Sequence, residues 1–281
     1  MYTFYKIKDV SEVVLLNLVN EVFSDYIVPV NWTINSFKRD IKEYSISSEE
    51  SFIVFEDEKP VGFSIVSVRG LRGRIDSFGV LKDRRGTGLA SEILKRTTES
   101  LKWKGIHNII LEVEQNEKRP INFYEKHGFR MKRKLETLIL KTNENDKNIY
   151  KYMREDAKWI HEISLDSNMS IKRKPNWQRE PKTLHLSDDR YFTDRVTDAG
   201  YTIGYVVWGE NTENYFIVDI APIADSTKYD EIVSDFLKKI SSGNKPVIIV
   251  ALPEDDILCG ILKNKGFETF ITQIEMEKNI H

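Results

Sequence analysis

One glycine-containing segment, Arg85-Gly86-Thr87-Gly88-Leu89-Ala90, limits the possible folds of this chain more than any other stretch. It follows an apolar run with strand character (74–81) and precedes a run rich in helix formers (91–101). Glycines at such a junction expose backbone N–H groups, and the positive end of the next helix dipole points at the same place. The segment therefore predicts a receptor for a phosphate or diphosphate between a strand and a helix.

A second block downstream gives this pattern its specificity, because short glycine patterns also occur in ordinary turns. The segment lacks the Gly-Lys-Ser/Thr of a P-loop and does not fit the dinucleotide fingerprint. Downstream, Leu111-Glu112-Val113 ends a predicted strand, and Asn122-Phe123-Tyr124-Glu125-Lys126-His127-Gly128-Phe129 predicts a short helix, a glycine stop and a new strand. In this order the two blocks resemble the GCN5-related N-acetyltransferase (GNAT) superfamily, with its R/Q-x-x-G-x-G/A segment and its Leu-Glu-Val…Phe-Tyr-Glu-Lys-x-Gly-Phe ending. A glycine-rich turn of another α/β protein is the alternative.

The resemblance implies an α+β fold in which helices flank a mixed, mostly antiparallel sheet. It also implies acetyl-CoA as the co-substrate, no metal, and transfer of the acetyl group to a primary amine. The separation of twelve positions from Glu112 to Tyr124 (124 minus 112) is usual in the branch that acetylates ribosomal-protein N-termini. The cofactor-binding residues implied are Phe78, Gly79, Val80, Arg85, Gly86, Thr87, Gly88, Leu89, Ala90 and Asn116.

Tyr124 and Glu112 are the catalytic candidates that the resemblance implies. Acyl transfer needs a proton for the departing thiolate, and a phenol with pKa about 10 can supply it to a thiol with pKa about 8.5. Tyr124 is expected in that role; a purely packing aromatic is the alternative. Glu112 is expected to take the amine proton directly or through water. An ion-paired or solvated carboxylate is an equal alternative for Glu112, with Glu114 as the fallback base.

Direct attack in a ternary complex is the expected route, since no nucleophile suits a covalent relay. The single cysteine, Cys259, lies in the second half and is expected to be a small buried residue. No spacing of histidine, cysteine and carboxylates suggests a metal site.

Two departures from the family pattern fall near the second block. An asparagine usually lies five places after the strand glutamate, whereas Asn116 lies four places after Glu112, and Arg119 takes a place that is usually small or apolar. Elsewhere, Asp25 and Tyr26 lie between the first two predicted helices and could bind a cationic amine, with capping and packing roles as the alternative.

The second half repeats the pattern of the first without its chemistry. An amphipathic helix containing Ile149, Met153, Ile160 and Ile163, two strands, a helix, a strand and a Gly266-Phe267 pair follow one another. Pro222-Ile223-Ala224-Asp225-Ser226-Thr227 replaces the glycine segment, while Leu262 and Val250 fall where Tyr124 and Glu112 would be. We therefore expect a catalytic domain at 1–143 and a degenerate GNAT-like domain at 148–281, joined by the polar linker 142–147.

Composition narrows the class of protein. A chain of 281 residues is long enough for two domains, and 42 basic against 44 acidic residues give no nucleic-acid footprint. No signal peptide or membrane-length apolar run is present, so a cytoplasmic protein, as monomer or homodimer, is expected. The acceptor could be a small-molecule or a peptide amine. The alternative function is a non-catalytic protein that binds or senses acyl-CoA.

Overall fold

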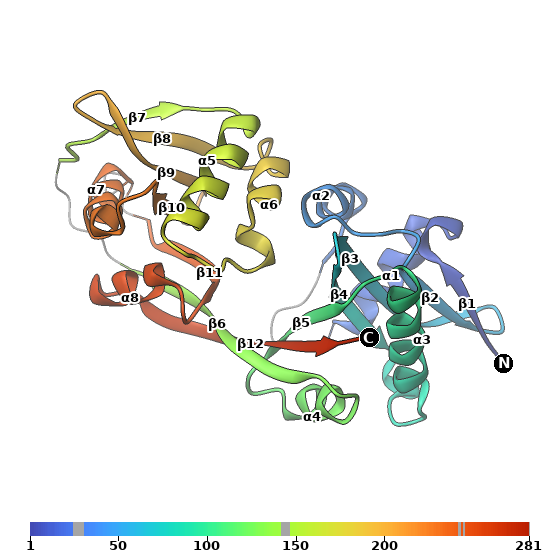
Figure 1. The fold of residues 1–281 in the computed structure, drawn as a ribbon. Helices are drawn as coiled ribbons and strands as arrows, with labels where there is room; N and C mark the ends of the chain where they lie inside the picture. The colour runs from blue at the N-terminus through green and yellow to red at the C-terminus, as the bar shows by residue number, and fades with distance from the viewer. Residues whose placement is uncertain (25–30, 142–146, 241–242, 244, 281) are drawn as a thin grey trace. The chain divides into compact units, whose positions relative to one another are not determined.

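The computed structural model describes residues 1–24, 31–141, 147–240, 243 and 245–280, and they form two compact units. The first unit comprises Met1–Lys132 and Glu275–His281, and the second comprises Arg133–Ile274. Each unit is an α+β structure with helices on both faces of its sheet, as the resemblance implied (Figure 1). Asp25 and Tyr26, considered above as amine-binding residues, lie outside the described residues.

The first unit is built around the strand order β1-β2-β3-β4-β5, followed by β12. Pairing is antiparallel from β1 to β4 and parallel between β4 and β5. Its elements in chain order are β1 (Tyr2–Lys6), α1 (Glu12–Val22), α2 (Ile34–Tyr44), β2 (Phe52–Glu56), β3 (Lys59–Arg69), β4 (Arg72–Val80), α3 (Leu89–Trp103), β5 (Asn108–Glu114), α4 (Lys118–Lys126) and the start of β6 (Arg130–Leu140).

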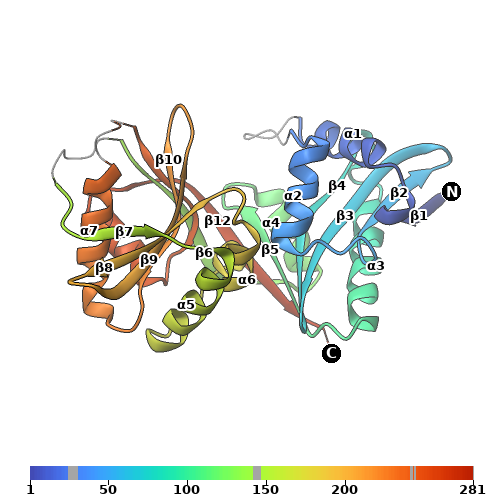
Figure 2. The ribbon, with the colours of Figure 1, turned by 90° about the horizontal axis from the view of Figure 1, so that it is seen from above.

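Helices α1 and α3 cover opposite faces of β3 and β4 (Figure 2). Gly62 and Phe63 are neighbours on β3 and therefore face opposite sides of the sheet. A Cβ on Gly62 would lie 2.8 Å from Ile93 of α3, and a Cβ on Gly79 would lie 2.5 Å from Val22 of α1 and 3.5 Å from Phe63. The glycine in β4 thus lets α1 approach the end of that strand closely.

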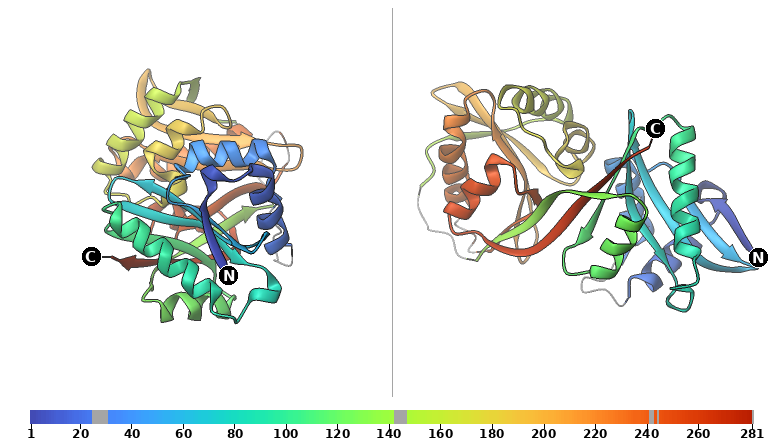
Figure 3. Two further views of the ribbon diagram at one scale, coloured as in Figure 1. Left: turned by 90° about the vertical axis from the view of Figure 1, so that its right-hand side faces the viewer. Right: turned by 60° about the horizontal axis from the view of Figure 1, so that its bottom comes forward.

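The second unit has the strand order β12-β6-β11-β10-β9-β8-β7, with β10 and β11 parallel. Helices α7 and α8 lie together on one face of these strands, and α5 and α6 lie on the other (Figures 1 and 3). Its elements are β7 (Lys151–Arg154), α5 (Ala157–Ser170), α6 (Pro181–Leu186), β8 (Phe192–Asp198), β9 (Tyr201–Glu210), β10 (Tyr215–Pro222), α7 (Tyr229–Ile240), β11 (Val247–Pro253), α8 (Ile257–Asn264) and β12 (Glu268–Asn279).

The helix expected from Ile149 to Ile163 is wrong in its first part. Residues 151–154 form β7, which pairs with β8, and Ile149 and Met153 are 83% and 52% exposed. The helix begins only after Asp156, whose carboxylate caps it by accepting a hydrogen bond from the Trp159 N–H at 2.8 Å. The helical spacing of the first two apolar residues was coincidental.

The units also divide the chain differently from the expected boundary at 143/148. Strand β6 was expected in the first domain, but from Arg133 onward it belongs to the second unit, where Leu140 pairs with Val247 of β11. The end of β12 takes its place in the first unit. Asn279 accepts a hydrogen bond from the Asn108 side chain at 2.9 Å, and the Ile280 N–H donates to the His107 carbonyl at 2.8 Å.

These contacts predict that the end of the chain stabilises β5. Met276 is fully buried in the last strand, so Met276→Ala should cost about 2–5 kcal/mol of unfolding free energy. Hydrogen exchange followed by mass spectrometry should show faster exchange in residues 108–114, and Glu277→Ala, at the next position, is the control. Unchanged protection of β5 in Met276→Ala would contradict the assignment of the last strand to the first unit.

Candidate active site

The site begins where two parallel strands stop pairing. Strands β4 and β5 pair from Arg72 with Asn108 to Ile75 with Leu111, and then both continue toward the same edge of the sheet. The pairing of β4 with β3 shifts at the same point, so that Asp76 is an extra residue in a β-bulge. Beyond the bulge, Phe78–Val80 form one wall of a cleft, and residues of α4 line it as well.

The glycine segment follows directly at this edge of the sheet. Gly86 and Gly88 have φ values of 87° and 93°, in the left-handed region that disfavours other residues. Gly88 is the N-cap of α3 and supplies no side-chain cap, so the first N–H groups of α3 have no partner from that residue. No atom lies within 4 Å of a Cβ placed on either glycine. The backbone around these two glycines therefore lies beside open space, which an anion receptor at this place would require.

A cleft of about 640 Å³ connects this loop to the aromatic residues of α4. Most of the predicted cofactor residues line it, as does Tyr124, while Thr87, Leu89 and Asn116 do not. The residues on its wall are Val22, Phe78, Gly79, Val80, Arg85, Gly86, Gly88, Ala90, Ser91, Glu117, Arg119, Pro120, Phe123 and Tyr124.

Tyr124 is held at the inner end of the cleft by aromatic packing. Its side chain comes from α4, is 8% exposed, and has ring-centroid distances of 6.1 Å to Phe78, 5.2 Å to Phe123 and 5.6 Å to Phe129. Phe78 belongs to β4 and Phe123 to α4, so both walls fix the orientation of the ring. A tyrosine hydroxyl placed in this way can donate a proton to a group lying along β4.

Glu112 lies in a buried charged cluster and not on the cleft wall. Its Oε2 is 3.4 Å from Arg74 Nη2, and Arg74 Nη1 is 3.1 Å from Asp76 Oδ1. The Ser67 hydroxyl donates a hydrogen bond to the other oxygen of Asp76. Burial raises the pKa of Asp76 to about 6, although Arg74 opposes that shift. Arg74 and Asp76 were not identified from the sequence; their signal is a series of charges at alternate positions of β4, which begins with Arg72.

Asn116 points away from the cleft. Its side-chain amide donates to Glu114 Oε1 at 2.8 Å, and its backbone N–H donates to Glu114 Oε2 at 2.9 Å. Both carboxylate oxygens of Glu114, the fallback base, therefore accept hydrogen bonds within this local turn. Glu117, Arg119 and Pro120 line the cleft in its place. The four-residue offset of Asn116 from Glu112 was the signal for this difference.

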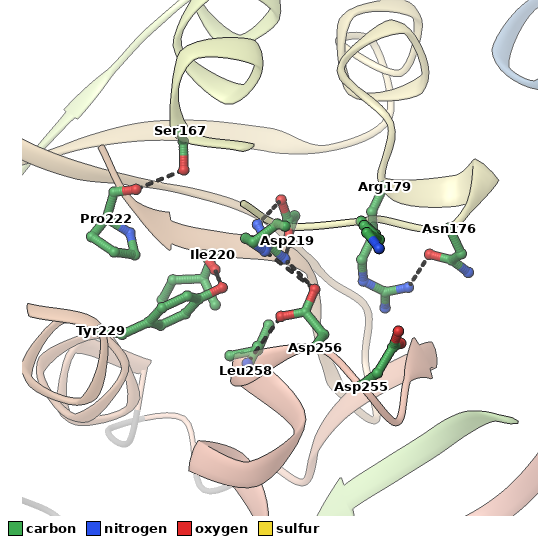
Figure 4. Close-up of polar contacts among 12 residues, drawn as sticks. Ser167, Asn176, Arg179, Asp219, Ile220, Pro222, Tyr229, Asp255, Asp256 and Leu258 are labelled. Atoms are coloured by element: carbon green, nitrogen blue, oxygen red, sulfur yellow. Dashed lines mark hydrogen bonds and ion pairs between the residues drawn. The ribbon is translucent and has the colours of Figure 1, made fainter. Parts of the chain in front are cut away.

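The second unit carries a buried ionic network near its own pair of parallel strands (Figure 4). Strands β10 and β11 pair only at Tyr215 with Val247 and Phe216 with Ile248. Arg173, 1% exposed, contacts Asp219 Oδ1 at 2.8 Å and Asp256 Oδ2 at 3.0 Å through Nη2. These carboxylates come from β10 and from the residue that caps α8.

Two further side chains of the same segment cover carbonyl groups of β11. Arg179 donates through Nη1 to the Ala251 carbonyl at 2.9 Å and through Nη2 to the Val250 carbonyl at 2.5 Å. Asn176 donates to the Ala251 carbonyl at 2.8 Å. Val250 is the residue that the sequence pattern superposes on Glu112. Side chains of the protein itself therefore donate hydrogen bonds to the backbone carbonyls in this part of β11.

The loop after β10 also differs from the glycine segment. Asp225 Oδ1 accepts hydrogen bonds from the backbone N–H of Thr227 at 2.9 Å and from its hydroxyl at 2.6 Å. The carboxylate of Asp225 therefore accepts a hydrogen bond from a backbone N–H group that could otherwise donate to a phosphate.

Comparison with known proteins gives a family match in the first half of the chain. The acetyltransferase (GNAT) family matches residues 15–129. The chain is 31% identical over 86 residues to N-alpha-acetyltransferase 30 of Schizosaccharomyces pombe, a match that covers 29% of this chain and 57% of that protein. It is 27% identical over 101 residues to the uncharacterized N-acetyltransferase YjcF of Bacillus subtilis, covering 32% of this chain and 70% of the relative.

Solved structures extend the likeness in fold to both units. A GCN5-related N-acetyltransferase from Sphaerobacter thermophilus has a TM-score of 0.69 at 11% identity, covering 99% of this chain and 95% of that one. A tandem GNAT protein from the clavulanic acid biosynthesis pathway has a TM-score of 0.68 at 10% identity, covering 99% and 98%. At such identities these likenesses concern the fold alone.

The two units share the fold of a tandem GNAT protein. Residues 15–129, in the first half of the chain, match the acetyltransferase (GNAT) family, and the relatives that this half resembles are named as N-acetyltransferases. The resemblance inferred from the two sequence blocks is confirmed.

Among the described residues, no helix is both long and apolar enough to span a membrane. No group of three or more histidine, cysteine, aspartate or glutamate side chains in that part of the chain is arranged to hold a metal ion.

The ionic network predicts a large stability loss when one member is removed. Asp219→Ala should lower the free energy of unfolding by about 3–5 kcal/mol in chemical denaturation, because it leaves the buried Arg173 with one carboxylate fewer. Asp166→Ala removes an exposed carboxylate of α5 in the same unit and should change stability by less than about 0.5 kcal/mol. Equal effects of the two substitutions would refute the structural role of the network.

Proposed function

We propose that this protein transfers an acetyl group from acetyl-CoA to a primary amine at the cleft of its first unit. The observation that carries the proposal is the continuous cleft from the glycine loop to Tyr124, lined by Phe78–Val80. Its volume of about 640 Å³ is within the usual range for cofactor sites. Backbone N–H groups at Gly86 and Gly88 suit a diphosphate, and the aromatic end suits an apolar thioester arm.

Acetyl-CoA would supply the activated acyl group, and direct attack then needs two proton transfers. The amine nitrogen forms a bond to the acyl carbon, the carbon–sulfur bond breaks, and the departing sulfur takes a proton. Tyr124 would donate that proton, since its ring is fixed against Phe78 and Phe123. A backbone N–H of Phe78, Gly79 or Val80 would donate a hydrogen bond to the acyl oxygen.

The amine proton would pass through water to the buried carboxylates. Glu112 remains our candidate base, and Asp76 lies next to it on the other side of Arg74. A pKa of about 6 makes Asp76 a stronger base than an ordinary carboxylate while leaving it ionised near neutrality. Because neither carboxylate lies on the cleft wall, a water molecule would carry the proton between them and the amine.

The acceptor class is a peptide or a small-molecule amine. The name of the Schizosaccharomyces relative supports an α-amine, which is also more easily deprotonated than a lysine-type amine. Release of free thiol from acetyl-CoA, measured over a panel of both amine types, tests the proposal and identifies the acceptor.

Substitution of the loop glycine tests the cofactor site. Gly88→Glu should abolish acetyl-CoA binding in calorimetry, because it places bulk and negative charge where the diphosphate would lie. Gly105→Glu is the matched control: Gly105 also has a positive φ (81°) with no atom within 4 Å of its Cβ position, and it is not on the cleft wall. The parent chain should bind one equivalent. Saturable binding left in Gly88→Glu would contradict both the site and the inactivity of the second unit.

Removing the hydroxyl of Tyr124 distinguishes the proposed enzyme from a non-catalytic protein that binds or senses acyl-CoA. Tyr124→Phe should keep acetyl-CoA affinity and lose about 100-fold or more in turnover, the usual share of a general acid. Tyr5→Phe, on an exposed tyrosine of β1, should leave both unchanged. Normal turnover in Tyr124→Phe would remove the proton-donor role, and a lack of turnover with every amine by the parent protein would favour the acyl-CoA-binding alternative.

A further inference from the structure

We propose that Arg119 binds a phosphate group of the cofactor from the wall opposite the glycine loop. The inference rests on the proposed function, because it assumes that acetyl-CoA occupies the cleft. Arg119 was noted in the sequence only as a departure at a place that is usually small or apolar. The structure puts this departure on the wall of the cleft.

Topology places Arg119 at the phosphate end of the cleft. Strands β4 and β5 are parallel, so their carboxyl ends lie at the same edge of the sheet. The glycine loop follows β4, and Arg119 follows β5 in the first turn of α4. Tyr124 is five residues further along α4, about 7.5 Å along the helix axis. A cofactor with its sulfur beside Tyr124 and its diphosphate at the loop therefore passes this turn of α4.

The guanidinium of Arg119 is available for such a contact. Its side chain is exposed, and no described residue forms a hydrogen bond or ion pair with it. The other guanidinium on the wall belongs to Arg85, which donates to the Val22 carbonyl at 3.3 Å. Lys118, the preceding residue, is exposed but does not line the cleft. Position on the wall thus distinguishes Arg119 from its cationic neighbour.

The charge of the cofactor calls for a cation in addition to the loop. Coenzyme A carries a diphosphate and a separate 3′-phosphate, while backbone N–H groups provide only partial positive charge. Glu117 adds a negative charge to the same wall. An arginine can pair with a phosphate through two parallel N–H donors, a geometry that lysine cannot reproduce. Arg119 would therefore provide both charge and orientation.

Calorimetry with the full chain tests this inference. Arg119→Ala should weaken coenzyme A binding by about 10- to 100-fold, the usual range for hydrogen bonds to charged groups, and Arg119→Lys should recover part of the loss. Lys118→Ala removes the neighbouring charge and should change affinity by less than about twofold. The KM for S-acetylpantetheine, which has no phosphate, should be the same in Arg119→Ala and the parent protein.

Dephospho-coenzyme A, which lacks the 3′-phosphate, distinguishes the two sources of phosphate. If Arg119→Ala binds it as well as the parent does, the arginine contacts the 3′-phosphate; if the loss persists, it contacts the diphosphate. Unchanged coenzyme A affinity in Arg119→Ala, or an equal loss in Lys118→Ala, would overturn the inference while leaving the proposed function intact. If the parent protein fails to bind coenzyme A, the proposed function itself is wrong.

Discussion

The separation of β4 and β5 after only four paired residues is the constraint on which the first unit depends. Two parallel strands that stayed hydrogen-bonded to their ends would leave no room between them. Here the pairing of β4 with β5 stops at Ile75, next to the bulge that Asp76 makes in the pairing of β4 with β3, and Phe78–Val80 then line the cleft. The same separation brings the end of β4, the glycine loop and the start of α4 to one edge. The cofactor binding and the chemistry that we propose both depend on this local loss of pairing.

In the second unit, buried side chains of the protein itself lie around the corresponding pair of parallel strands, β10 and β11. Its parallel pair β10 and β11 makes two paired positions, and the segment after α5 supplies Arg173, Asn176 and Arg179 to the groups around them. Buried ions are stable only when they are paired, so such a network holds the segment in one place. The last residues of β12, which include the buried Glu275 and Met276, belong to the first unit.

Local signals in the sequence predicted the parts of the site that local geometry determines. The glycines of the loop and the Tyr124 helix were identified because each has a short-range pattern of its own. Glu112 and Asn116 were placed less well, since their positions depend on Arg74 and Glu114. The exchange of β6 for the end of β12 could not be predicted, because the partners of both strands are far away in sequence. Pairing between strands that are so far apart in sequence produces no periodic pattern of residues in the sequence.

The cluster of Arg74, Asp76 and Glu112 connects the fold to the proposed chemistry. Removed from water, a lone carboxylate would be neutral near pH 7, whereas a carboxylate beside a guanidinium stays ionised. One arginine here faces two carboxylates, so its field is divided between them, and burial raises the pKa of Asp76 to about 6. Asp76 also makes the bulge in the pairing of β4 with β3, directly after the last position at which β4 pairs with β5. The residue at which the regular strand geometry changes is therefore also a carboxylate whose pKa burial raises to about 6.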